Sequence, residues 1–147
     1  MRINAFSDVS LRVLMVLSTE RELLTTRTIA DAVGTPYNHV SKAVLKLRQM
    51  GLVEAVRGRA GGVRISDAGL AATVGGVLRI LDDRQDVADC QTDMGDCPLA
   101  HGCGLRGALT LAREAFYASL DNVTVASLVR APSPEPVEVT LLTSRLA

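Results

Sequence analysis

The chain of 147 residues is poor in aromatic side chains, with no tryptophan, two tyrosines and two phenylalanines. Proteins that bind single-stranded nucleic acid stack the bases on aromatic rings, so the sequence disfavours that class. The core must instead be built from aliphatic side chains. A chain of this length buries roughly 70% of the surface that its unfolded form exposes, which is enough for one domain with an appended dimerisation element.

Long apolar runs are also missing. Gly69–Leu78 carries no charge, but it is too short and too rich in glycine to span a bilayer. The first eight residues include Arg2 and Asp8 and contain no apolar stretch, so they do not resemble a signal peptide. We therefore expect a cytoplasmic protein without a membrane partner.

The net charge is zero, yet the two halves of the chain differ. Residues 1–66 contain ten Lys or Arg and five Asp or Glu, whereas residues 67–147 contain six and eleven. A basic half beside an acidic half indicates a surface that faces a polyanion, although chance segregation produces the same pattern.

Hydrophobic periodicity predicts three helices in the first 50 residues, with Ser7, Thr26 and Thr35 as N-caps. Gly34 is expected to end the second helix, and Pro36 to occupy the first position of the third. The predicted spans are residues 7 to 19–22, 26–34 and 35–50.

The period then changes to that of short strands at residues 52–56 and 63–65, joined by the basic, glycine-rich turn Arg57–Gly62. Three helices followed by a basic hairpin are the order of a winged helix-turn-helix. The predicted fold class is therefore mainly α with a small β wing, followed by a long C-terminal dimerisation helix. Ser66 is expected to open one continuous fourth helix that reaches Leu81.

The remaining chain divides into three predicted parts. A fifth helix at residues 105–120 carries an apolar stripe, which we interpret as a dimer interface, and residues 124–130 add one or two turns. Residues 132–147 contain three prolines and are expected to form a flexible tail. We thus predict a DNA-binding region at 1–66, and a linker helix, a ligand-binding loop (about 82–104) and a dimerisation helix within 67–131. The interface residues are Leu105, Leu109, Ala112, Phe116 and Leu120.

The third helix has the composition of a helix that reads DNA. Val40 is needed in the core, so Tyr37, Asn38, Ser41 and Lys42 should project outward. A recognition helix places its N-terminal residues against base edges in the major groove, where Asn pairs with adenine and Ser donates or accepts.

Basic side chains extend this predicted surface. Lys42, Lys46 and Arg48 suit phosphates, and Arg57 and Arg59 on a glycine-rich tip suit the minor groove or flanking phosphates. The alternative interpretation is a solvated helix face and an ordinary hairpin. The combined order and spacing favour double-stranded DNA as the partner.

All three cysteines, Cys90, Cys97 and Cys103, lie within 14 residues, in a segment without periodicity that also contains six aspartates. An odd number of thiols predicts a metal or redox role rather than a disulfide framework. Three thiolates and a fourth ligand hold either an iron–sulfur cluster or zinc, and the spacing C-x6-C-x5-C leaves both open. His101 fits a solvated loop residue better than a ligand.

Two stretches together resemble one family closely: Leu47–Gly62, which reads LRQMGLVEAVRGRAGG, and the three cysteines before the helix that begins at Leu105. They are similar to the iron–sulfur winged-helix regulators of the Rrf2 family, and most similar to its nitric-oxide-sensitive repressors. The resemblance implies a homodimer on a palindromic operator, a 4Fe–4S cluster, and release of DNA when nitric oxide attacks the cluster. It also implies that Asp8 of the partner subunit completes the ligand set.

The resemblance has two departures. Arg106 stands where a related branch has a histidine ligand, which counts against a 2Fe–2S cluster, and the first cysteine spacing is one residue longer than usual. The alternatives are an iron- or redox-sensing regulator with a 2Fe–2S cluster, a zinc-dependent regulator, and an electron-transfer protein. No nucleotide loop or acid–base pair is recognisable, so we expect no enzyme activity.

Overall fold

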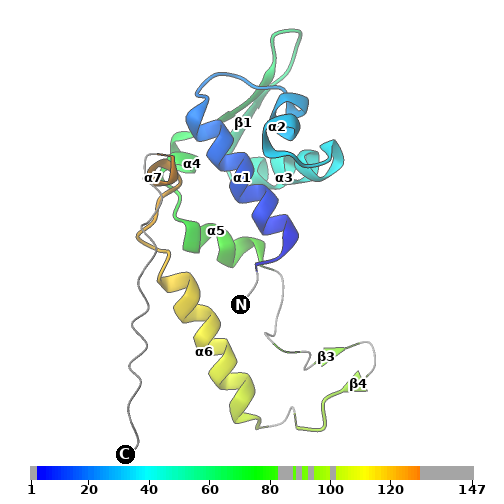
Figure 1. Cartoon of the computed structure of the whole chain (residues 1–147), viewed down its shortest axis with the longest axis vertical. Helices are drawn as coiled ribbons and strands as arrows, with labels where there is room; N and C mark the ends of the chain where they lie inside the picture. The colour runs from blue at the N-terminus through cyan, green and yellow to red at the C-terminus, as the bar shows by residue number, and fades with distance from the viewer. Residues whose placement is uncertain (1–2, 83–87, 89–90, 93–94, 100–101, 130–147) are drawn as a thin grey trace, which may run out of the picture.

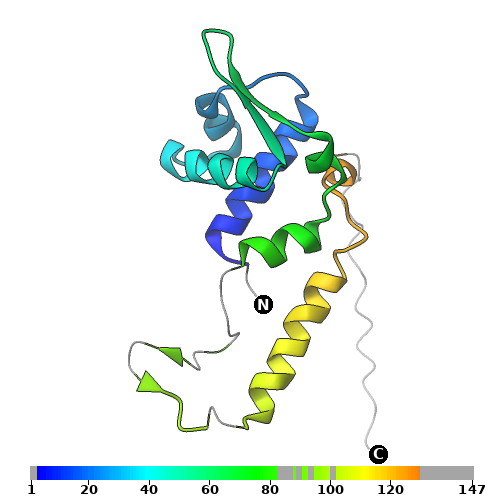
Figure 2. The ribbon, with the colours of Figure 1, turned by 180° about the vertical axis from the view of Figure 1, so that it is seen from behind.

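The computed structural model describes residues 3–82, 88, 91–92, 95–99 and 102–129 (Figures 1 and 2). Three helices and a hairpin come first, and helices and one short two-stranded sheet follow. The elements are α1 (Ala5–Thr19), α2 (Thr26–Val33), α3 (Tyr37–Gln49), β1 (Val53–Val56), β2 (Gly62–Ile65), α4 (Asp67–Ala71), α5 (Val74–Leu81), β3 (Gln91–Thr92), β4 (Gly95–Asp96), α6 (Gly104–Ala118) and α7 (Val125–Leu128). This order confirms the predicted winged helix-turn-helix.

The core is aliphatic, as the scarcity of aromatic residues predicted. Most of the side chains that are fully inaccessible come from the first three helices, and Val125 of α7 joins them. Among the described residues, Tyr117 is the one buried aromatic side chain, and it belongs to a second, smaller cluster with Val74 and Leu78. The main cluster includes Val13, Leu14, Leu17, Ile29, Val40 and Leu47.

The helix starts differ from the predicted caps. Asn4, not Ser7, caps α1, because its side-chain oxygen accepts a hydrogen bond from the Ser7 amide at 2.6 Å. Ser7 lies one turn inside, and its buried hydroxyl has no hydrogen-bond partner. Similarly, Thr25 rather than Thr26 caps α2. Pro36 is the N-cap of α3, since its ψ of 138° is not helical.

The wing is an antiparallel hairpin in which Val53 pairs with Ile65 and Val56 with Gly62. Leu24 pairs with β2 as an isolated antiparallel bridge. Its amide donates to the Val63 carbonyl at 2.9 Å, and its carbonyl accepts from the Val63 amide at 2.8 Å. This pairing joins the wing to the segment between α1 and α2. The orientation of the hairpin is therefore fixed by the helix-turn-helix itself.

The prediction of one continuous helix after Ser66 is wrong. The chain forms α4 and α5 with an extended break at Ala72 and Thr73, and the Thr73 hydroxyl caps α5 by accepting from the Gly76 amide at 3.1 Å. The break is stabilised by partners distant in sequence: the Ala72 carbonyl accepts from the Val125 amide at 2.9 Å, and Thr73 bridges to Thr124.

Helix α6 begins and ends close to the predicted bounds and extends away from the winged-helix part of the molecule (Figures 1 and 2). Its contacts within the chain are chiefly with α5. The predicted apolar stripe is divided between two environments. Phe116 and Leu120 pack against the smaller core cluster, whereas Leu105 is 65% exposed and Ala112 is exposed.

Candidate DNA-binding surface and metal ligands

The outer face of α3 presents the side chains predicted to read DNA. Val40 is fully buried, which leaves Tyr37, Asn38 and Lys42 exposed and Ser41 half-buried along the opposite side of the helix. The pattern of burial therefore agrees with the orientation that the sequence predicted.

Tyr37 has a neighbour that sequence reasoning missed. The guanidinium carbon of Arg27, in the first turn of α2, lies 5.5 Å from the centre of the Tyr37 ring. A cation over an aromatic face is attracted by the ring quadrupole, so Arg27 restricts the position of Tyr37 at the start of α3. The two residues come from different helices, and no local pattern in the sequence pairs them.

Leu45 is a second residue that the sequence analysis did not select. It lies on α3 four residues after Ser41 and is 53% exposed. The signal was available, because Val40, Val44 and Leu47 already satisfy the inward face and leave Leu45 outside it. An exposed leucine among polar groups on this face can contact the methyl group of thymine.

His39 also lies on α3 and is exposed. Together with Lys42 it borders a shallow pocket of about 290 Å³ against Ala5, Phe6 and Val9 of α1. From this position His39 can pack against α1 or contact a DNA phosphate.

The tip of the wing carries Arg57 and Arg59, both exposed. Gly58 between them has a φ of 115°, a conformation that side-chain-bearing residues rarely adopt, so glycine is required there. Arg64 lies lower on the wing and binds Glu54 at 2.8 Å. The two tip arginines are thus the basic side chains of the wing that extend beyond its paired strands.

The predicted metal ligands are only partly covered by the described residues. Cys90 and His101 lie outside them. Cys97 and Cys103 are half-buried and are not joined in a disulfide. Cys103 is the N-cap of α6, and its side chain makes no capping hydrogen bond. The two thiols form no disulfide, and that of Cys103 accepts no hydrogen bond from the first amides of α6. Both are therefore compatible with a role as metal ligands.

Asp8 lies in the first turn of α1, where its carboxylate binds Arg12 one turn later at 3.0 Å. The starts of α1 and α6 are well separated in both views (Figures 1 and 2). Within the described part of the chain, no three histidine, cysteine, aspartate or glutamate side chains come together as a metal site. The starts of α1 and α6, to which Asp8 and Cys103 belong, thus lie apart within one chain (Figures 1 and 2).

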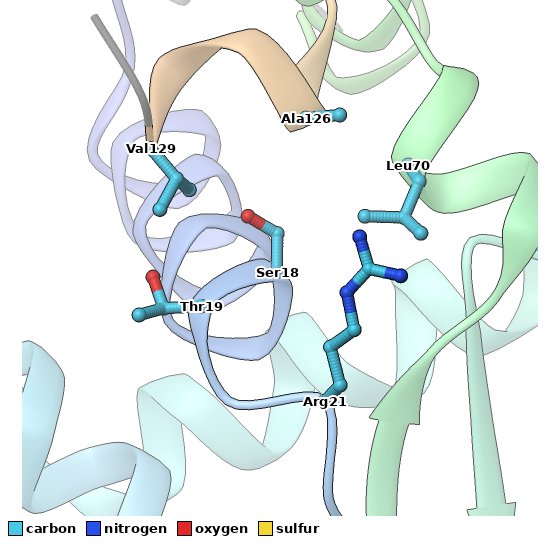
Figure 3. Close-up of a pocket in the computed structure, with 6 residues that line it drawn as sticks. All are labelled: Ser18, Thr19, Arg21, Leu70, Ala126 and Val129. Carbon is cyan, nitrogen blue, oxygen red and sulfur yellow. The ribbon is translucent and has the colours of Figure 1, made fainter.

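A separate pocket of about 250 Å³ lies away from α3, between the end of α1, α4 and α7 (Figure 3). Arg21 extends into it beside Ser18 and Leu70. The lining of this pocket includes none of the residues predicted to bind DNA or metal.

The arrangement of α2, α3 and a basic wing defines the winged-helix class of DNA-binding proteins. No helix in the described ranges is long and apolar enough to cross a membrane. The family of iron-dependent transcriptional regulators named Rrf2 matches residues 3–131. The chain belongs to the Rrf2 family.

Individual relatives agree with this assignment. The transcriptional repressor NsrR of Streptomyces coelicolor is 47% identical over 136 residues, which cover 90% of this chain and 91% of that protein. The regulator NsrR of Bacillus subtilis is 35% identical over 133 residues, which cover 88% of this chain and 91% of that protein. This chain is thus a transcription regulator similar to the NsrR proteins.

Solved structures support the fold. T. potens IscR superimposes with a TM-score of 0.68 at 17% identity, covering 88% of this chain and 87% of that one. The cysteine regulator CymR of B. subtilis gives a TM-score of 0.66 at 22% identity, and the match covers 88% of this chain and 97% of that one.

Proposed function

We propose that this protein is a homodimeric repressor that binds palindromic double-stranded DNA and releases it when nitric oxide reacts with a 4Fe–4S cluster. The observation that carries the proposal is the exposed face of α3 beside a basic wing, in a chain 47% identical to a repressor named NsrR.

The exposed side chains of α3 divide by chemistry. Asn38 pairs with adenine, Ser41 donates to or accepts from a base edge, and Leu45 contacts a thymine methyl. Tyr37, held by Arg27, and Lys42 contact phosphates and fix the register of the helix. Arg57 and Arg59 at the tip of the wing reach the minor groove or the flanking phosphates.

Cys90, Cys97 and Cys103 are the proposed ligands in one subunit, and Asp8 of the other subunit is the fourth. Three thiolates together with a carboxylate form a donor set that suits iron, and the described thiols, Cys97 and Cys103, are unpaired. The separation of α1 from the start of α6 is compatible with a carboxylate supplied across the dimer. When bound, such a cluster supplies an iron site that reacts with nitric oxide.

The chain's own residues explain why this ligand set affects DNA binding. Asp8 is on α1, and α1 packs directly against α3. A link between Asp8 and the cysteine segment of the partner therefore ties each recognition helix to the opposite subunit. Loss of that link leaves the two recognition helices free to move relative to each other, which weakens binding to two half-sites at once.

The test uses full-length protein purified without air and a duplex selected by that protein from a random library. Anisotropy should show that the logarithm of the affinity falls linearly with that of the salt concentration. A slope of about −5 to −9 corresponds to six to ten phosphate contacts. Anaerobic nitric oxide should abolish this binding in the wild type.

Two variants separate the parts of the proposal. Cys97→Ala should lose bound iron and tight binding, whereas Asn38→Ala should keep its iron and lose sequence preference. A flat salt dependence would contradict DNA binding. Iron-free protein that binds the selected duplex at full strength would contradict control by a cluster.

A further inference from the structure

One cluster of charged side chains outside the proposed DNA and metal sites joins α5 to α6. Arg79 of α5 forms two parallel hydrogen bonds with the carboxylate of Asp121, Nη1 to Oδ1 at 2.6 Å and Nη2 to Oδ2 at 2.8 Å. The same guanidinium donates from Nε and Nη2 to Glu114 Oε1 at 2.9 and 2.7 Å. A single side chain therefore holds two carboxylates on either side of the end of α6.

The Arg79 guanidinium also covers an aromatic ring. Its central carbon lies 5.8 Å from the centre of the Tyr117 ring, and Tyr117 is buried. The Tyr117 hydroxyl donates to the carboxylate of Asp82, the first residue of the predicted ligand-binding loop. The beginning of that segment is thus connected to α6, which follows it in the sequence.

The backbones of the two helices approach closely at the same place. A Cβ at Gly75 would overlap the Asp121 side chain and the carbonyl oxygen of Tyr117, so no residue but glycine fits this contact without movement. The Gly75 amide donates to the Leu120 carbonyl at 3.2 Å, and the Val74 amide to the Val123 carbonyl at 2.8 Å. These bonds, together with the packing of Phe116 and Tyr117 on Val74 and Leu78, hold the end of α6 against α5.

The guanidinium contacts add a constraint on the direction of α6 to that apolar packing. Glu114 lies on the helix itself, and Asp121 lies in the turn after it, so Arg79 bonds to two points on either side of the helix end. The hydrogen bonds from Arg79 hold the pKa of Asp121 below its usual value, and Asp121 is ionised at neutral pH. A rigid, planar fork that binds two carboxylates constrains an angle in a way that a lysine cannot.

We propose that Arg79 is a positioning residue that sets the angle of α6 to the winged-helix part, and thereby the separation of the two recognition helices in the dimer. The inference rests on the proposed function, because it requires that α6 pairs two copies of the chain on one palindromic duplex. Half-sites of such duplexes are spaced by helical turns of DNA, so a change in the angle of α6 changes the preferred spacing.

An ion pair that only contributed stability would have a different effect. Loss of stability lowers the fraction of folded protein, and this reduces binding to every duplex by the same factor. Loss of a fixed angle instead reduces the preference among spacings. The measurement that separates a positioning role from a purely stabilising one is therefore the ratio of affinities for duplexes that differ in the spacing of their half-sites.

The experiment uses the duplex selected by the full-length protein and two derivatives in which the centre is shortened or lengthened by one base pair. The wild type should bind the selected spacing about tenfold more tightly than the altered ones, since one base pair rotates a half-site by about a tenth of a turn. Arg79→Gln should reduce this ratio to about threefold or less, and Arg79→Lys should give an intermediate value.

Arg64→Gln is the matched control, because Arg64 forms an exposed ion pair with Glu54 on the wing. It is expected to keep the wild-type ratio even if its absolute affinity changes. Gly75→Ala alters the same contact from the opposite side and should also reduce the ratio. Circular dichroism checks that Arg79→Gln is folded. If it is not, the affinity ratios of Arg79→Lys and Gly75→Ala decide the question. Sedimentation confirms that each variant remains a dimer.

The possible failures are distinguishable. A wild type without a spacing preference would contradict the proposed dimeric repressor. A wild type that prefers one spacing, together with Arg79 and Gly75 variants that keep the full preference, would overturn the role of Arg79 and leave the proposed function intact.

Discussion

At the scale of the residue, the DNA-binding face of α3 is defined by which side chains the core requires. Val40, Ala43, Val44 and Leu47 are buried, and the remaining positions are left to polar or basic groups, with Leu45 as the exception. A single half-exposed leucine is common on protein surfaces, so Leu45 is singled out by its place on the face that carries Asn38 and Ser41 and not by its exposure.

Replacement of Leu45 tests the proposed contact with a thymine methyl. If Leu45 contacts a thymine methyl, substitution of that thymine by uracil should weaken binding by the wild type about fourfold for each methyl group lost, which corresponds to about 0.8 kcal/mol. The Leu45→Ala variant should bind the thymine and uracil duplexes equally. Titration of each duplex by anisotropy measures the effect, and an equal uracil penalty in both proteins would show that Leu45 does not contact the methyl.

At the scale of the element, α1 shows how a helix start is decided by competing polar residues. Asn4 and Ser7 are both good N-caps, but the register with Asn4 as the cap places Ser7 in the core beside Ser10. The hydroxyl of Ser7 has no hydrogen-bond partner, so this register leaves one buried polar group unsatisfied. Asn4 offsets part of that cost, because its amide also donates to the Leu81 carbonyl at 3.3 Å.

Two alanine substitutions separate the two registers. Asn4→Ala should lower the free energy of unfolding by about 1 kcal/mol, the usual cost of a lost N-cap. Ser7→Ala should be neutral or stabilising by about 1 kcal/mol, because it removes an unsatisfied buried hydroxyl. Urea denaturation of the three proteins measures both values. The opposite ranking would mean that Ser7 is the cap, as the sequence alone suggested.

At the scale of the whole molecule, α6 exposes large apolar side chains that no contact within one chain covers. Leu105 is 65% exposed and Leu111 is 74% exposed, whereas the end of the helix is packed against α5. The two leucines lie on different sides of α6, since six residues correspond to more than one and a half turns. The predicted interface stripe includes Leu105 and excludes Leu111, which makes the pair a matched test.

Leu105→Glu should convert the dimer to a monomer without lowering the stability of the fold, because the side chain makes little contact within its own chain. Leu111→Glu is the control and should leave the dimer unchanged. Sedimentation velocity distinguishes the two states, and circular dichroism checks the fold. Dissociation by Leu111→Glu, with Leu105→Glu still dimeric, would move the interface to the other side of α6.

The sequence by itself determined the order of the first three helices and the wing, and the outward side of α3. These features depend on local periodicity, on glycines such as Gly34 and Gly58, and on the change from a helical to a strand period, all of which short segments contain. The likeness of Leu47–Gly62 and of the cysteine spacing to a known family was also readable without coordinates, and the family match over residues 3–131 agrees with it.

Tertiary structure decided what depends on distant partners. The break at Ala72 and Thr73 exists because Val125 and Thr124 bond to it, and the periodicity of residues 70–81 contains no trace of those partners. The stack of Arg27 on Tyr37 and the bonds of Arg79 to Glu114 and Asp121 likewise join residues from separate elements. Such contacts form only when the core sets the helices side by side, so a local pattern cannot predict them.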